Sequence, residues 1–189
     1  MAHLTAGVEY GIHCLLWLAL ERDTSLSSRD LADLQGVSPS FVAKLFPKLE
    51  KAGIVVASSG LRGGYRLARP AARISLLDVV DAIEGPKPLF DCQEIRGRCA
   101  LFDVAPPRWA TNGVCAIHAA MLRAEQAMRE SLAATTLADI ADTVGRKAPA
   151  SFAQAVTAWV GGRTDARSAR RGTRGRGSEA SAAPIWGVS

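Results

Sequence analysis

Residues 58–85, SSGLRGGYRLARPAARISLLDVVDAIEG, decide the fold that we expect for this chain. Residues 55–57 and 65–67 are short runs suited to two strands, and they flank a glycine-rich turn. The turn contains the glycines that can adopt a positive φ: Gly60, Gly63 and Gly64. We therefore predict a β-hairpin with Arg62 at its tip, followed by a capped helix. A hairpin of this kind is typical of a DNA-binding wing.

A helix-turn-helix is expected directly before the hairpin. Residues 27–35, SSRDLADLQ, begin with a capping-box pattern and stop at Gly36. A second helix is expected to begin after Ser38, with Pro39 at its first position. Helix, turn, helix and hairpin in this order predict a winged helix-turn-helix, in which the second helix enters the major groove.

The outward face of the second helix is polar. Together with the wing tip, it supplies the residues that we expect to contact DNA: Ser38, Ser40, Lys44, Lys48 and Arg62. A polar face alone is ordinary for an amphipathic helix. Its combination with a wing predicts a surface for double-stranded DNA.

Composition agrees with a regulator that acts in the cytoplasm. The chain has 189 residues, 48% of them hydrophobic, and a formal net charge of +5, which suits a polyanionic partner. No stretch is long and apolar enough to predict a membrane span, and the N-terminal pattern is unlike a signal peptide. Motifs of nucleotide-binding, hydrolytic and metalloprotease enzymes are absent from the sequence, so we expect no catalytic activity.

The sequence divides the chain into four parts. Residues 1–84 form the predicted DNA-binding domain, and residues 85–113 form a long loop that contains cysteines. Residues 114–145 contain a long amphipathic helix and a short capped one. Residues 146–189 show helical periodicity at first and then turn basic, with six arginines against one aspartate over residues 161–177. This composition predicts a disordered basic tail, for which two roles stay open: salt-sensitive affinity for DNA, or no function of its own. The predicted class is mainly α, with a small β-hairpin wing and a long dimerisation helix.

The four cysteines indicate a metal site in the long loop. They form no CxxC pair, and Cys14 lies on an apolar helical face where it suits the core. Cys92, Cys99 and Cys115 lie in or beside the loop, where cysteines are better explained as ligands than as packing. His118 follows Cys115 within CAIH, so a set of three cysteines and one histidine is possible.

The order of elements and the wording of the sequence resemble the Rrf2 family of bacterial transcription regulators over residues 4–144. The resemblance rests on SPSFVAKLFPKLEKAGIV (38–55), GLRGGYRLARP (60–70) and ISLLDVVDAIEG (74–85). The family includes iron-sulfur sensors of the IscR, NsrR and RsrR types. The chain is most similar to the RsrR type, through GVEYGIHCLLWL (7–18), FDCQEIR (90–96) and SLAATTLADIADTV (131–144).

The resemblance to the RsrR type implies a 2Fe-2S cluster held by Glu9, His13, Cys92 and Cys115. Glu9 and His13 are four residues apart, so on a helix they share one face. In the family the cluster joins the first helix of one subunit to the cysteine loop of the other. Cys99 and His118 depart from this pattern, and they keep the IscR-like set of three cysteines and a histidine as an alternative.

The resemblance also implies a homodimer, formed by the helix that begins near residue 114, that binds a palindromic operator. We therefore expect a DNA-binding transcription regulator, of which repressors are one kind, controlled by a redox-sensitive 2Fe-2S cluster. Two other interpretations stay open: a nitric oxide or iron-sulfur-status sensor with the three-cysteine set, and a cluster-free regulator that uses thiol oxidation. The wing argues against an electron-transfer protein.

Overall fold

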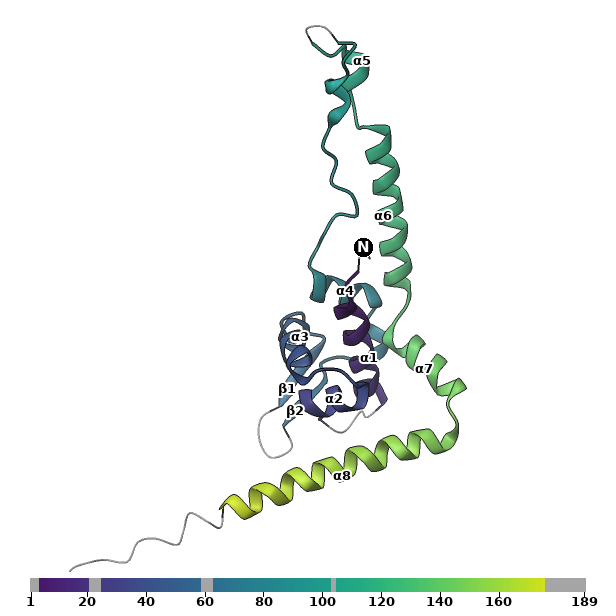
Figure 1. Ribbon diagram of the computed structural model, residues 1–189. Helices are drawn as coiled ribbons and strands as arrows, with labels where there is room; N and C mark the ends of the chain where they lie inside the picture. Colours follow the sequence, from purple (N-terminus) through teal and green to yellow (C-terminus); the bar gives the residue numbers. More distant parts are fainter. Residues whose placement is uncertain (1–3, 21–24, 59–62, 103–104, 176–189) are drawn as a thin grey trace, which may run out of the picture.

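The computed structural model describes residues 4–20, 25–58, 63–102 and 105–175, and it is mainly helical with a small two-stranded sheet (Figure 1). The helices are α1 (Ala6–Leu20), α2 (Ser28–Gln35), α3 (Pro39–Lys51), α4 (Leu76–Glu84), α5 (Arg108–Thr111), α6 (Ala116–Ala134), α7 (Leu137–Lys147) and α8 (Ala150–Gly175). Two short 3-10 helices are η1 (Ala71–Arg73) and η2 (Ile95–Arg98), and the strands are β1 (Val55–Ser58) and β2 (Gly64–Leu67). In the described ranges, no helix is both long enough and apolar enough to cross a bilayer.

Local capping signals determine where the helices of the winged domain begin and end. Reciprocal capping boxes start three helices: Ser27 with Asp30 before α2, Ser75 with Asp78 before α4, and Thr136 with Asp139 before α7. Gly36 ends α2 in the left-handed conformation, with φ of 70°. These features confirm the helix-turn-helix order.

The hairpin is confirmed, but one of its glycines has a different role from the one that we expected. Gly64 does not have a left-handed φ; a Cβ there would lie 2.6 Å from the carbonyl carbon of Leu26. Leu26 and Tyr65 exchange two backbone hydrogen bonds of 3.0 and 2.8 Å, which hold the backbone before α2 against β2. Gly64 is therefore required by this close approach. Gly60 and Arg62 lie outside the described residues.

We expect Gly64→Ala to lower the free energy of unfolding by about 1–3 kcal/mol, because the added methyl group must push the Leu26 backbone away. Urea denaturation measures the change. Gly145→Ala is the matched control, since a Cβ at that exposed position of α7 meets no atom within 4 Å. Equal stability of the Gly64→Ala variant and the parent would contradict this account of the wing.

The hydrophobic core lies among α1, α2, α3, α4 and the hairpin. Leu15, Leu31 and Phe46 are fully buried, and the centre of the Phe46 ring lies 4.7 Å from that of Tyr65, with the two rings tilted at 52°. Cys14 is also fully buried, and desolvation raises the pKa of its thiol to about 12. Cys14 is therefore a neutral core residue, as predicted.

The N-terminus of α1 is joined to the C-terminus of α4. The carboxylate of Glu84 accepts hydrogen bonds from the Thr5 backbone and hydroxyl groups and from the Lys87 ammonium. These donors, Lys87 first, hold the pKa of Glu84 at about 2. The two helices also pack closely, since a Cβ at Gly11 would lie 2.6 Å from Ile83.

Beyond α4, the chain leaves the winged domain and projects from it (Figure 1). We call the projecting part, from residue 85 to the first turn of α6, the tip. The predicted loop 85–113 is only partly irregular, because it contains η2 and α5. Phe102 and Trp109 pack edge to face at 6.1 Å and give this short segment an apolar contact of its own. The long helix α6 then returns to the domain, and it begins at Ala116, close to residue 114 where we predicted its start.

The last helix differs from our expectation. We predicted disorder from residue 161, but α8 continues to Gly175. Alanine and arginine are good helix formers, and Val156 and Val160 anchor the first half of α8 by burial in the core. Residues 176–189 lie outside the described part of the chain.

Candidate functional site

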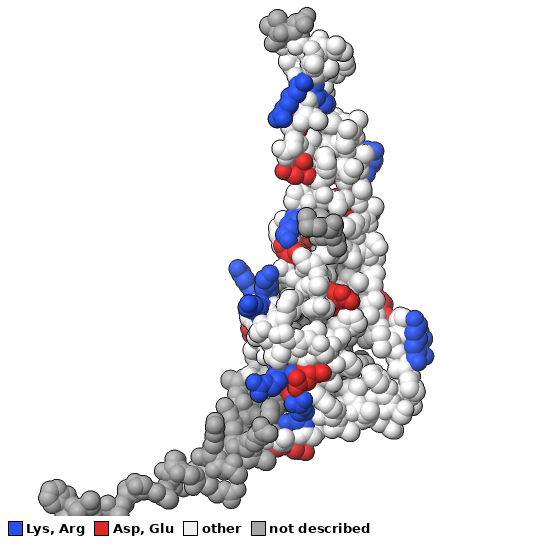
Figure 2. Space-filling model, viewed as in Figure 1, with Lys and Arg blue, Asp and Glu red and all other residues white. Residues whose placement is uncertain are grey.

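Two regions contain the residues that we predicted to be functional: the exposed face of α3 and the projecting tip. On α3, Ser38, Ser40 and Lys44 are exposed, and the Ser38 and Ser40 hydroxyls are 2.8 Å apart. Figure 2 shows Lys and Arg side chains gathered on the surface over this helix. Although Pro47 lies inside α3, the helix continues without a break to Lys51.

Lys48 has a structural contact in addition to its exposure on α3. Its ammonium donates a 2.8 Å hydrogen bond to the carbonyl of Ile83, near the C-terminal end of α4. A cation at this position complements the helix dipole of α4. Two further cations at this surface were missed: Lys51 at the end of α3 and Arg66 on β2, both exposed. The signal for Arg66 in the sequence was its place between Tyr65 and Leu67, because the middle residue of such a strand faces the opposite side from its two neighbours.

At the tip, the Arg96 side chain joins the residues that follow Cys92 to the residues that precede Cys115. Its Nη2 donates to the carbonyls of Thr111 at 3.2 Å and Gly113 at 2.9 Å, and its side chain is paired with Glu94. The hydrogen bond to Glu94 is the main cause that raises the pKa of Arg96, followed by its charge and then by those of Cys115 and Cys92. Both thiols therefore lie within electrostatic reach of one guanidinium.

Cys92 and Cys115 are partly buried at the tip. Cys115 is the N-cap residue of α6, where the helix dipole adds positive potential to that of Arg96. Arg96 was not among the residues predicted from the sequence, although its position four residues after Cys92 was visible in FDCQEIR.

The alternative ligands also lie in this part of the molecule. Cys99 is exposed, at the end of η2. The His118 ring lies 6.2 Å from that of Phe90, and its charge contributes to the lowered pKa of Glu94, for which the hydrogen bond from Arg96 is the largest cause. The tip therefore contains three of the four cysteines and one histidine.

Glu9 and His13 are exposed on α1, one helical turn apart, and belong to the winged domain. In the part of the chain that the structure describes, no three His, Cys, Asp or Glu residues are placed to hold one metal ion together. A single chain thus keeps Glu9 and His13 apart from Cys92 and Cys115. The reason is the fold itself, since α1 is packed on α4 while the cysteines lie on the projecting tip.

The first half of α6 presents a bare apolar surface, which we call the α6 apolar face. It consists of Ile117, Met121 and Leu122 on α6 and of Val114 just before the helix, which are 63%, 37%, 48% and 67% exposed. The second half of α6 is held on the domain instead, because Arg129 donates to both carboxylate oxygens of Asp81 at 3.1 and 2.9 Å. An apolar face that loses its cover halfway along a helix is typical of a subunit interface.

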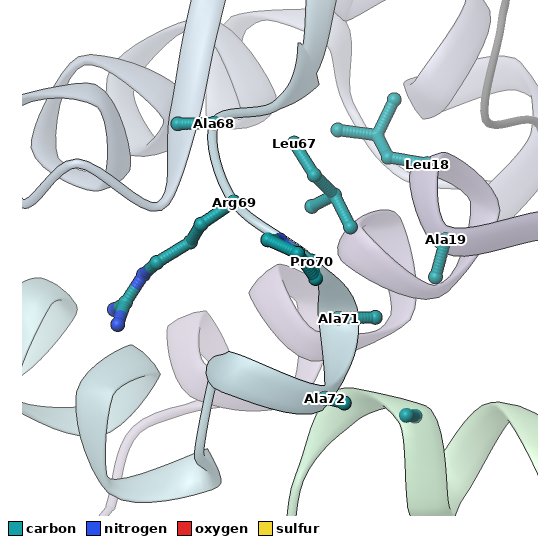
Figure 3. Close-up of a pocket in the computed structure, with 9 residues that line it drawn as sticks. Leu18, Ala19, Leu67, Ala68, Arg69, Pro70, Ala71 and Ala72 are labelled. Atoms are coloured by element: carbon teal, nitrogen blue, oxygen red, sulfur yellow. The ribbon is translucent and has the colours of Figure 1, made fainter.

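A surface pocket of about 570 Å³ lies away from both regions, between α1, η1 and α7 (Figure 3). Leu18, Leu67 and several alanines line it, and none of its nine lining residues is His, Cys, Asp or Glu. Arg69 extends away from Leu18 and Leu67 and pairs with Asp78 at 3.2 Å. The pocket therefore brings together no groups that could act on a substrate.

Comparisons with known proteins agree with the fold and identify the family. Residues 4–143 match the family model Rrf2, described as an iron-dependent transcriptional regulator. Protein rrf2 of Nitratidesulfovibrio vulgaris is 35% identical over 138 residues, which are 72% of this chain and 85% of that protein.

Solved structures show the same fold. CymR (YrzC), the global cysteine regulator of B. subtilis, has a TM-score of 0.60 and 24% identity over 76% of this chain and 98% of its own. IscR of T. potens has a TM-score of 0.60 and 24% identity over 79% of this chain and 93% of its own. Another relative, 35% identical over 139 residues, is named as an HTH-type transcriptional regulator of Mycobacterium tuberculosis, so the relatives of this chain are transcription regulators and not enzymes. From the family match and the winged helix-turn-helix, we conclude that this chain belongs to the Rrf2 family of DNA-binding transcription regulators.

Proposed function

We propose that the protein is a homodimeric regulator whose binding to a palindromic operator is controlled by a redox-sensitive 2Fe-2S cluster. In this proposal Glu9 and His13 of one subunit face Cys92 and Cys115 of the other, and the regulator acts in the cytoplasm, where it meets DNA. The observation that carries the proposal is the division of the four candidate ligands between the winged domain and the tip of one chain.

The donor groups fit such a cluster. Cysteine sulfur is the usual ligand of iron in these clusters, and histidine replaces it in some of them. Arg96 and the N-terminus of α6 place positive charge beside Cys92 and Cys115, which suits an anionic group. The bound cluster would supply a centre that gains and loses one electron.

The α6 apolar face supports the homodimer. Its residues lie at the end of α6 nearest to the tip, so a second copy that covers them would also come close to the cysteine segment. An intersubunit site is thus compatible with the direction in which the tip projects.

A second candidate function uses the tip alone. Cys92, Cys99 and Cys115 with His118 would form an IscR-like set for sensing nitric oxide or cluster supply. All four belong to residues 92–118, although among the described residues no three of them are placed to hold one metal ion. A cluster-free thiol regulator is a third candidate, which the exposure of Cys99 favours. The absorption spectrum and the iron and sulfide content of protein purified without oxygen test the proposal. Protein without iron or sulfide would contradict both cluster-based functions.

Operator binding by α3 is tested with Lys44→Ala. We expect it to weaken binding to the selected operator about tenfold, because an exposed ammonium on the face predicted to meet DNA is lost. Arg62→Ala is expected to act in the same direction. Anisotropy titrations against a duplex selected from genomic fragments measure the change, with Lys147→Ala on α7 as the control. An affinity unchanged in Lys44→Ala would move the DNA interface away from this face of α3.

A further inference from the structure

Cys92 and Cys115, the two thiols common to both ligand sets, lie on segments of the tip that are far apart in the sequence. In the described residues between them, the helical structure consists of η2 and α5, which have four residues each. Helices of this length are not stable on their own. The relative position of the two thiols therefore depends on contacts made across the tip.

The Arg96 side chain is the point at which these contacts meet. It pairs with both carboxylate oxygens of Glu94, and its Nη2 also donates to the carbonyls of Thr111 and Gly113 at 3.2 and 2.9 Å. The side chain is only 23% exposed. One planar guanidinium thus connects the segment after the first thiol to the segment before the second.

The backbone at Glu94 depends on the same ion pair. Its φ is 44°, and among the described residues it is the single non-glycine residue with a positive φ. A residue with a Cβ adopts this left-handed conformation at an energetic cost, so the surrounding contacts must hold it there. Because Arg96 binds the Glu94 carboxylate, loss of the guanidinium would release the turn that follows Cys92.

Two apolar contacts support the tip beside this ion pair. A Cβ at Gly97 would lie 3.3 Å from Pro106, and the rings of Phe102 and Trp109 pack edge to face. These contacts join η2 and the residues after it to α5. The hydrogen bonds of the guanidinium continue the connection from α5 toward the N-terminus of α6.

We propose that Arg96 is a positioning residue that holds the segments of Cys92 and Cys115 together in the cluster-free protein, so that both thiols are in place when the cluster binds. This role rests on the cluster proposed above and applies to either ligand set. The shape of the side chain is essential to it, since a guanidinium presents several N–H donors in one plane, whereas the ammonium of lysine is a compact charge on a flexible stem. Ligands that are already ordered bind more tightly, because less freedom is lost on binding.

The variants Arg96→Lys and Arg96→Gln separate the shape of this side chain from its charge, because lysine keeps only the charge. Arg98→Gln is the matched control, since Arg98 is exposed on the same helix η2. Amide hydrogen exchange is measured on the cluster-free full chain. The rate at which bipyridyl removes iron from protein purified without oxygen is followed by visible absorption.

We expect both Arg96 variants to exchange the amides of residues 93–98 and 111–115 about tenfold faster than the parent. They should lose the cluster roughly ten to a hundredfold faster, as is usual when a residue that orients metal ligands is replaced. Exchange in α1 to α4 should stay unchanged, which shows that the winged domain remains folded. Arg98→Gln should match the parent in both measurements.

If the parent holds the cluster and Arg96→Lys matches it in both measurements, the positioning role is wrong and the proposed cluster stands. Equal rates of cluster loss in Arg98→Gln and Arg96→Gln would also contradict the role, because charge alone would then explain the effect. A parent protein without iron would overturn the proposed function itself, and this role of Arg96 would fall with it.

Discussion

Cys92→Ala and Cys115→Ala are each expected to give protein without the visible absorption of a 2Fe-2S cluster and with almost no bound iron. The physical reason is that these thiols are the two sulfur donors common to both ligand sets, and both lie beside Arg96. Anaerobic purification followed by absorption spectroscopy and iron and sulfide analysis measures the loss. A parent-like spectrum in either variant would contradict a cluster at the tip.

Replacing the other four candidate ligands, Glu9, His13, Cys99 and His118, decides which of the two ligand sets holds the cluster. If Glu9 and His13 are ligands, replacing either by alanine should change the spectrum, whereas Cys99→Ala and His118→Ala should keep it. Mössbauer spectra should then resolve two different irons, one with sulfur ligands and one with nitrogen and oxygen. Loss of the cluster in Cys99→Ala together with an unchanged Glu9→Ala protein would favour the three-cysteine set.

Met121→Asp is expected to convert the proposed dimer into monomers, with a dissociation constant raised by a hundredfold or more. Met121 lies in the α6 apolar face, and a carboxylate buried there without a partner costs about 3 kcal/mol or more, which is a factor above one hundred. Sedimentation velocity over a range of concentrations measures the change.

Arg123→Gln is the control, because Arg123 is exposed two residues further along α6 and so lies on the opposite side of the helix. It should leave the sedimentation of the parent unchanged. A Met121→Asp protein that still sediments as a dimer would place the interface elsewhere.

Signals local in the sequence predicted most of the winged domain. The capping boxes at Ser27 and Ser75 and the stop at Gly36 are confirmed, because each depends on residues within one or two helical turns. Gly64 was predicted for the wrong reason, since the Leu26 backbone that it meets is far away in the sequence. The hydrogen bond from Lys48 to the Ile83 carbonyl was not predicted either, because these two residues are also far apart in the sequence.

The candidate site was harder to predict than the fold. Residue types and the resemblance identified possible ligands, but a single chain does not bring Glu9 and His13 to Cys92 and Cys115, so their meeting stays a prediction. Composition was misleading for α8, because glycine and serine between the arginines hid a helix that Val156 and Val160 anchor.

The contacts between α1, α3 and α4 limit how a signal can reach DNA. Glu84 binds Thr5 at the start of α1, Lys48 of α3 binds the Ile83 carbonyl on α4, and Tyr10 of α1 packs 5.2 Å from Phe41 of α3. If Glu9 and His13 hold the proposed cluster, a displacement of these residues would move α1, and these contacts would move α3 with it. In the proposed dimer, such a movement would leave the bases read by each half unchanged and alter the distance and rotation between the two halves. An operator would then be distinguished by the number of base pairs that separate its two arms.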